Sequence, residues 1–130
     1  MNITSKIPVS SDLDVVMARM EARKIAKELG FSTADQARIS LAASELARVL
    51  SWNSDAPGEI VFSAASQNGH RGFQAICLVK REYIEDSPTA TATVPIPSRC
   101  LIGARQLVDE SIVEELDDQR AQVTLIKWLN

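Results

Sequence analysis

The sequence predicts an α/β fold, a two-layer sandwich in which three helices cover one face of a mixed, mostly antiparallel sheet of about five strands. The expected elements follow the order strand, two helices, two strands, helix, two strands. Strands joined as hairpins, with helices grouped apart from them, pack as one sheet under one helical layer. No internal repeat appears, and the length suits one unit, so we expect a single domain over residues 1–130.

The composition is that of a folded, water-exposed chain. Of the 130 residues, 45% are hydrophobic and 24% are charged, and the formal net charge is −3. No apolar run approaches the ~18 residues of a membrane span, and the first residues lack the apolar core of a signal peptide. Nucleic-acid binders usually carry a basic domain. We therefore expect a cytoplasmic protein with no membrane or nucleic-acid partner.

The first half of the chain reads as a strand and two helices. Residues 2–9 predict an opening strand, and Ser11 with Asp14 gives the start signal of a helix. That helix should run to Leu29, and Gly30 should end it because glycine enters the left-handed conformation cheaply. Its apolar residues have the spacing of a helix packed on a core. They form one row, Leu13, Val16, Met17 and Met20, with Val15, Ala22, Ile25, Ala26 and Leu29 beside it.

A second helix should follow after a very short turn. Ser32 to Asp35 is another start signal, and the expected helix extends from Thr33 to about Ser51. Its apolar residues at helical spacing are Ile39, Ala42, Ala43, Leu46, Val49 and Leu50. Two long helices joined so closely should lie side by side.

The second half of the chain changes to the two-residue period of strands. Residues 58–66 and 72–80 predict a hairpin around Asn68-Gly69. Residues 86–98 hold three prolines and predict an irregular connection. A short helix near 100–108 and strands near 111–116 and 120–129 complete the chain, with a turn at Asp117-Asp118 and one buried face on the last strand.

Isolated reactive side chains do not form a recognisable site. Cys77 and Cys100 lack the spacing of a zinc site, so we expect buried packing residues and no metal. His70 falls in a turn and is expected to be exposed. Trp52 and Trp128 are either core-edge residues or anchors of an interface.

Two stretches carry a family resemblance. The stretch VSSDLDVVMARMEARKIAKELGFSTADQARISLAASELARVL, above all LGFSTADQARISLAASELAR, resembles the anti-sigma-factor and switch-protein serine kinases of the RsbT/RsbW type. The tail GARQLVDES…VTLIKW is similar to the end of the same family. These kinases belong to the Bergerat-fold ATPases, also called the GHKL or HATPase class, so the resemblance implies that fold.

The resemblance also implies an ATP site on the second helix. The family's helix supplies a glutamate and, one turn later, an asparagine that holds Mg²⁺. Glu45 matches the glutamate, a candidate base, but Val49 stands where the asparagine is expected. Valine has no oxygen to offer a hard cation and fits the apolar stripe instead. Glu45 is either a remnant of that chemistry or a carboxylate paired with Arg48 or Arg38.

The family's two glycine-rich loops are also missing. Lys80 or Arg81 stands where an aspartate should receive the adenine amino group, and a cation has no acceptor for it. In the second loop Ser98 and Cys100 replace glycines and only Gly103 remains, so side chains should obstruct the phosphates. We therefore expect no cofactor, and ATP with Mg²⁺ only if the kinase is active.

Two functions remain open on these residues. The first is a pseudo-kinase module that binds a protein partner; by resemblance this would be a STAS-domain antagonist, a sigma factor or a PP2C-type phosphatase, and a homodimer is also conceivable. The alternative is an active serine/threonine kinase with a divergent pocket. The candidate partner-binding residues are Arg19, Arg23, Arg48, Tyr83, Arg99 and Arg105. Basic residues also gather at Lys24 and Lys27, on a docking face or a solvated one.

Overall fold

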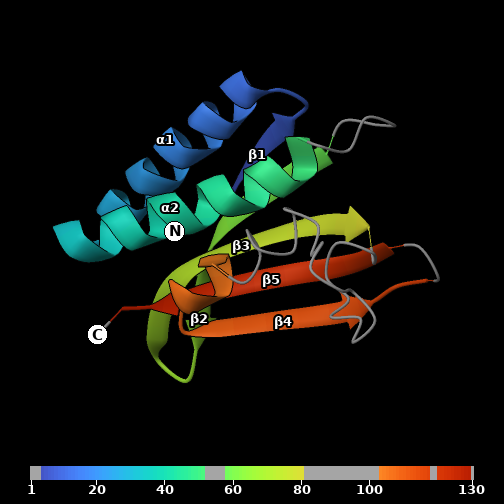
Figure 1. Cartoon of the computed structure of the whole chain (residues 1–130). Coiled ribbons are helices and arrows are strands. Elements are labelled where there is room, and N and C mark those ends of the chain that lie inside the picture. Colours follow the sequence, from blue (N-terminus) through green and yellow to red (C-terminus); the bar gives the residue numbers. More distant parts are fainter. Residues whose placement is uncertain (1–3, 52–57, 81–102, 118–119, 130) are drawn as a thin grey trace.

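The elements form in the order that the local sequence signals predict. The computed structural model describes residues 4–51, 58–80, 103–117 and 120–129, and shows two long helices on one face of a five-stranded sheet (Figure 1). Its elements are β1 (Thr4–Val9), α1 (Asp12–Leu29), α2 (Thr33–Ser51), β2 (Gly58–Gln67), β3 (His70–Lys80), β4 (Glu110–Glu115) and β5 (Arg120–Trp128). The predicted two-layer α/β fold is confirmed.

The third predicted helix appears in part. Residues 103–106 are helical, and Ala104 within them is fully buried in the same core as α1 and α2. The start of the predicted segment, residues 100–102, lies outside the described residues, as does the expected irregular connection at 86–98.

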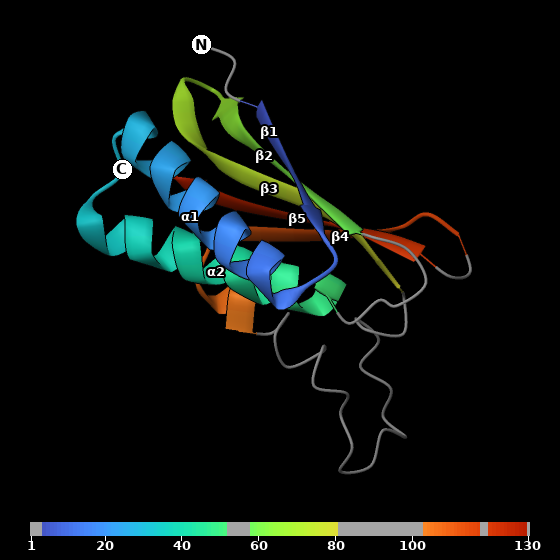
Figure 2. The ribbon, with the colours of Figure 1, turned by 90° about the horizontal axis from the view of Figure 1, so that it is seen from above.

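The sheet has the strand order β1-β2-β3-β5-β4, so β5 lies between β3 and the edge strand β4 (Figure 2). All four neighbouring pairs are antiparallel. The β2–β3 hairpin closes at Gln67 opposite His70, with positive φ at Asn68 (53°) and Gly69 (81°). Positive φ at both central residues defines a type I′ turn, whose twist matches that of the strands. The Asn-Gly prediction is thereby confirmed.

Both ends of α1 follow the predicted signals. The Ser11 hydroxyl accepts from the Asp14 N–H at 3.4 Å, and Asp14 Oδ2 accepts from the Ser10 N–H at 2.9 Å. At the other end Gly30 has φ 97°, and its N–H reaches the last helical carbonyls. A side chain there would be strained, because L-residues rarely adopt this conformation.

Asp14 should make stability depend on pH in the acid range. The hydrogen bond from the Ser10 N–H is the main cause that lowers the pKa of this carboxyl below its usual 3.8. A group with a lowered folded pKa stabilises above its unfolded pKa and loses that contribution as pH falls through the folded value. We expect Asp14→Asn to lower stability at pH 7, and the difference from the parent protein to shrink as pH falls below ~4 and to vanish only below the lowered folded pKa.

Urea unfolding between pH 7 and pH 2 checks this expectation. Asp12→Asn is the matched control, because it removes a carboxylate from the same turn without touching the capping hydrogen bonds. A constant difference between Asp14→Asn and the parent at every pH would contradict the assignment.

The helices pack closely because α1 turns a row of small residues inward. Ala18, Ala22 and Ala26 are fully buried, and Ser40 of α2 donates to the carbonyl of Arg19 at 3.4 Å. Small side chains let two helix backbones approach, and the side-chain ridges of each helix then fit the grooves of the other. The core continues between the helices and the sheet, where the rings of Phe62 and Phe73 lie 5.4 Å apart.

One expectation about α1 is wrong. Its apolar row does not face the core: Leu13 is 69% exposed, Val16 38%, Met17 50% and Met20 61%. Of the set beside it, Ala22, Ile25, Ala26 and Leu29 are buried, and Val15 is partly buried. The first half of α1 is apolar on two faces, but only the face with Ala18, Ala22 and Ala26 stays apolar or small along the whole helix, so that face packs on the core.

A buried lysine forms ion pairs that link the start of α2 to the end of the sheet. Lys127 on β5 is only 8% exposed, and its Nζ lies 3.4 Å from Asp109 Oδ1 and 4.0 Å from Asp35 Oδ1. Asp109 also accepts from the Trp128 N–H at 2.7 Å, and the Trp128 indole donates to Glu110. Trp128 is thus a half-buried edge residue held by β4. A charge this buried needs such partners.

Candidate functional site

Two of the residues that the family resemblance places at an ATP site, Glu45 and Val49, lie on the second half of α2. Glu45 is partly buried, with a side chain 18% exposed, and its Oε1 lies 3.6 Å from Arg48 Nη1. Arg38 instead pairs with Asp35 at 2.9 Å. Of the two partners suggested for Glu45, the structure therefore selects Arg48, whose own side chain is 48% exposed.

Val49 is part of the hydrophobic core. It is 0% exposed and belongs to the cluster that joins α2 to the sheet, together with Leu46 and Leu50. Its burial fits the apolar stripe predicted for α2. A position four residues after Glu45 that is filled by a packed hydrocarbon offers neither an oxygen ligand nor space for a hydrated cation.

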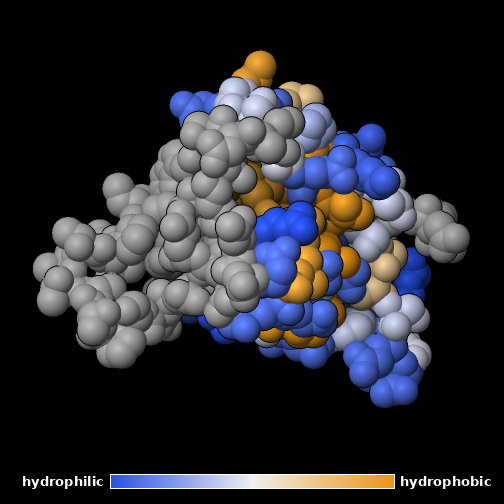
Figure 3. Space-filling view, turned by 90° about the vertical axis from the view of Figure 1, so that its right-hand side faces the viewer, coloured by the Kyte–Doolittle hydropathy of each residue, from blue (hydrophilic) through white to orange (hydrophobic). Residues whose placement is uncertain are grey.

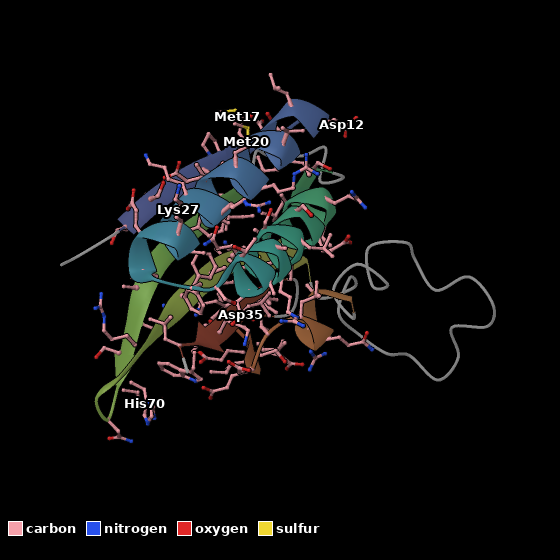
Figure 4. The ribbon with its side chains drawn as sticks, turned by 90° about the vertical axis from the view of Figure 1, so that its left-hand side faces the viewer. Asp12, Met17, Met20, Lys27, Asp35 and His70 are labelled. Carbon is pink, nitrogen blue, oxygen red and sulfur yellow. The ribbon has the colours of Figure 1, made fainter. Side chains whose placement is uncertain are left out.

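No alternative metal centre appears in the part of the chain that the structure describes. Within those residues, no group of three or more His, Cys, Asp and Glu side chains could hold a metal ion. His70 is exposed in the β2–β3 hairpin, far from the helices in Figure 4. Burial raises the pKa of the Cys77 thiol to about 12, so the thiolate required of a nucleophile is disfavoured at neutral pH.

The second predicted loop is described only at its end. Gly103 begins the helical segment 103–106, and a side chain at this position would meet no described atom within 4 Å. Packing against the described residues therefore does not require a glycine here. Arg105 is exposed and its Nε donates to Ser111 of β4 at 3.1 Å. The other expected positions lie outside what the structure describes: Trp52, Arg81, Tyr83, Ser98, Arg99, Cys100 and the side chain of Lys80.

The remaining partner-binding candidates lie on α1. Arg19 and Arg23 are exposed, as are Lys24 and Lys27, and no ion pair between described residues involves these four side chains. Figure 4 places Met17 and Met20 on the outer edge of the same helix, between Asp12 and Lys27. The sequence analysis identified the basic residues but assigned the apolar row to the core. The residues along that row change from apolar to basic, and this change was the signal that could have shown that the row is exposed.

Among the described residues, no helix is both long enough and apolar enough to cross a membrane.

Comparison with known proteins identifies the family. No protein-family model matches the chain. The chain is, however, 32% identical over 136 aligned positions to the serine/threonine-protein kinase RsbT of Bacillus subtilis (strain 168), and the alignment covers 99% of both proteins. A relative this similar over its full length shares the fold and the regulatory-kinase ancestry. The chain therefore belongs to the RsbT-type family of anti-sigma and switch serine/threonine kinases.

Proposed function

We propose that this domain is a pseudo-kinase of the switch-kinase family, which regulates by binding a protein partner and does not hydrolyse ATP. The observation that carries the proposal is the burial of Val49, 0% exposed, one helical turn after Glu45. In the family to which the chain belongs, this position is expected to hold Mg²⁺ on the triphosphate. Without that ligand Glu45 lacks a bound metal ion beside it, and its carboxylate pairs with Arg48 at 3.6 Å instead.

Substitutions in the sequence support the same conclusion. Lys80 or Arg81 replaces the expected adenine acceptor, and Ser98 and Cys100 replace phosphate-loop glycines. Each change acts on a different part of the ligand: the metal, the base and the phosphates. A fold can keep its binding surfaces after such losses, because function depends on the site rather than on the fold.

Partner switching is the regulation that the family resemblance implies. The proposed partner is a STAS-domain antagonist, a sigma factor or a PP2C-type phosphatase. Arg19, Arg23 and Arg48 are exposed cations that could contact such a protein. The second candidate function, an active serine/threonine kinase, has one observation in its favour, namely the retained Glu45 on α2.

Calorimetric titration with Mg-ATP separates the two functions. We expect no saturable heat up to millimolar nucleotide, because no oxygen ligand replaces the missing asparagine. Glu45→Ala is the matched variant, since it should change nothing in a pseudo-kinase. Saturable binding at micromolar Mg-ATP that is lost in Glu45→Ala would establish the kinase instead.

A further inference from the structure

The outer side of α1 carries a seam with the spacing used in helix pairs. Positions 13, 16, 17, 20, 23, 24 and 27 repeat the intervals of three and four residues that place side chains in one row. Every residue in this row is exposed. The row faces away from α2 and the sheet, and in Figure 4 Met17, Met20 and Lys27 follow one another along α1. It spans ~21 Å at the rise of an α-helix.

The chemistry of this seam changes at its middle. Its first four residues are apolar: Leu13, Val16, Met17 and Met20, between 38% and 69% exposed. Its last three are Arg23, Lys24 and Lys27. Figure 3 shows small apolar groups among hydrophilic ones at the top of the molecule, the height at which α1 lies in Figure 1. A group of exposed apolar residues on one helix face is often an interaction site.

The three cations are not neutralised within the described part of the protein. Glu28 follows Lys24 by the four residues that favour an ion pair, yet no ion pair between described residues involves Arg23, Lys24 or Lys27. The whole chain has a formal net charge of −3, so this basic half-seam is a local exception. A surface of this kind favours an acidic partner by charge complementarity.

A second copy of the chain fits the seam poorly. Two α1 helices packed antiparallel over the full row would place Leu13 against Lys27, which buries a charge on an apolar residue. Pairing over the apolar half alone would cover two helical turns on each copy. It would leave Arg23, Lys24 and Lys27 of both copies outside the contact, so the basic half of the seam would have no complement.

We propose that the outer seam of α1 is the docking surface for a helix of a partner protein, and that this helix is apolar along one half and acidic along the other. The proposal rests on the proposed function, because it names the surface through which the pseudo-kinase binds. The partner helix lies antiparallel to α1, with its acidic N-terminal half over Arg23, Lys24 and Lys27. Acidic residues near its N-terminus also complement its own dipole.

A designed peptide tests the surface without the natural partner. The probe is a synthetic helix of about 18 residues, long enough to be helical, with glutamates on one face of its N-terminal half and leucines on that face of its C-terminal half. We expect saturable binding by fluorescence anisotropy, weakened by added salt. A peptide with lysines in place of the glutamates should bind at least ~10-fold more weakly, since like charges then face each other.

Variants of the full chain assign the binding to the seam. We expect Lys24→Glu/Lys27→Glu and Met17→Ser/Met20→Ser each to weaken binding of the glutamate peptide at least ~10-fold. Arg71→Glu is the matched control, because it reverses an exposed cation on β3 and should leave binding unchanged. All these positions are exposed, so unfolding curves should shift little.

Several outcomes would overturn the proposal. These are no binding of the glutamate peptide, equal binding of the lysine peptide, a dimer in sedimentation that Met17→Ser/Met20→Ser dissociates, or cosedimentation with phosphatidylglycerol vesicles that the same variants abolish. Mg-ATP titration of the same preparation keeps the two proposals apart. If both the nucleotide and the peptide bind, only the pseudo-kinase proposal is refuted. If neither the nucleotide nor the peptide binds, only the proposed docking surface is refuted.

Discussion

Replacing Val49 with asparagine is expected to lower the free energy of unfolding by about 2–4 kcal/mol and to create no Mg-ATP site. Val49 is 0% exposed inside the cluster between α2 and the sheet. An amide there loses the apolar contacts of valine and buries hydrogen-bonding groups that packed hydrocarbon cannot satisfy. Urea unfolding measures the loss, with an unchanged slope showing that the unfolded state is the same.

Arg48→Asn is the control for this substitution. It introduces the same amide one residue earlier, at a side chain that is 48% exposed, and should change stability by less than about 0.5 kcal/mol. If Val49→Asn were as stable as the parent and bound Mg-ATP, position 49 would face a usable pocket. The assignment of position 49 to a closed, packed core would then be wrong, although the native valine would still lack an oxygen ligand for Mg²⁺.

Phe62→Ala is expected to be the most destabilising single change, at about 3–5 kcal/mol. Phe62 is fully buried on β2, and its ring lies 5.4 Å from that of Phe73 on β3, tilted by 37°. The truncation removes a large apolar side chain, leaves a cavity between helices and sheet, and ends the aromatic contact. Urea unfolding followed by circular dichroism measures the change.

The neighbouring residue supplies the control. Val61 lies on the same strand but on the opposite face of the sheet, where it is only partly buried. Val61→Ala should cost less than about 1.5 kcal/mol, since its surroundings already include solvent. Equal losses for the two variants would mean that the sheet has no preferred face, contrary to the two-layer fold.

Local signals explain how much of the fold could be predicted from the sequence. Ser11 and Gly30 bound α1, and Asn68-Gly69 sets the β2–β3 hairpin, because each acts through its own backbone or its nearest neighbours. The position of Val49 on the buried stripe of α2 was predictable for the same reason, since helical spacing alone places it beside Leu46 and Leu50.

Contacts between distant residues could not be predicted. The first half of α1 has apolar residues at helical spacing on two of its faces. Which of these faces is buried depends on how Ala18, Ala22 and Ala26 pack against α2. The sequence around Lys127 predicts a strand but not that this lysine is buried, because its burial depends on Asp109 and Asp35. Those carboxylates come from a turn and a helix that only the folded chain brings together.

The central claim is that a hydrocarbon side chain at position 49 removes the place where magnesium triphosphate would bind. A crystal structure of the protein grown with a non-hydrolysable ATP analogue and Mg²⁺ tests it most directly. The account predicts an α2 surface without ordered nucleotide and a core in which Val49 keeps its contacts. Electron density for the analogue beside Glu45, with a magnesium ion on its phosphates, would contradict it.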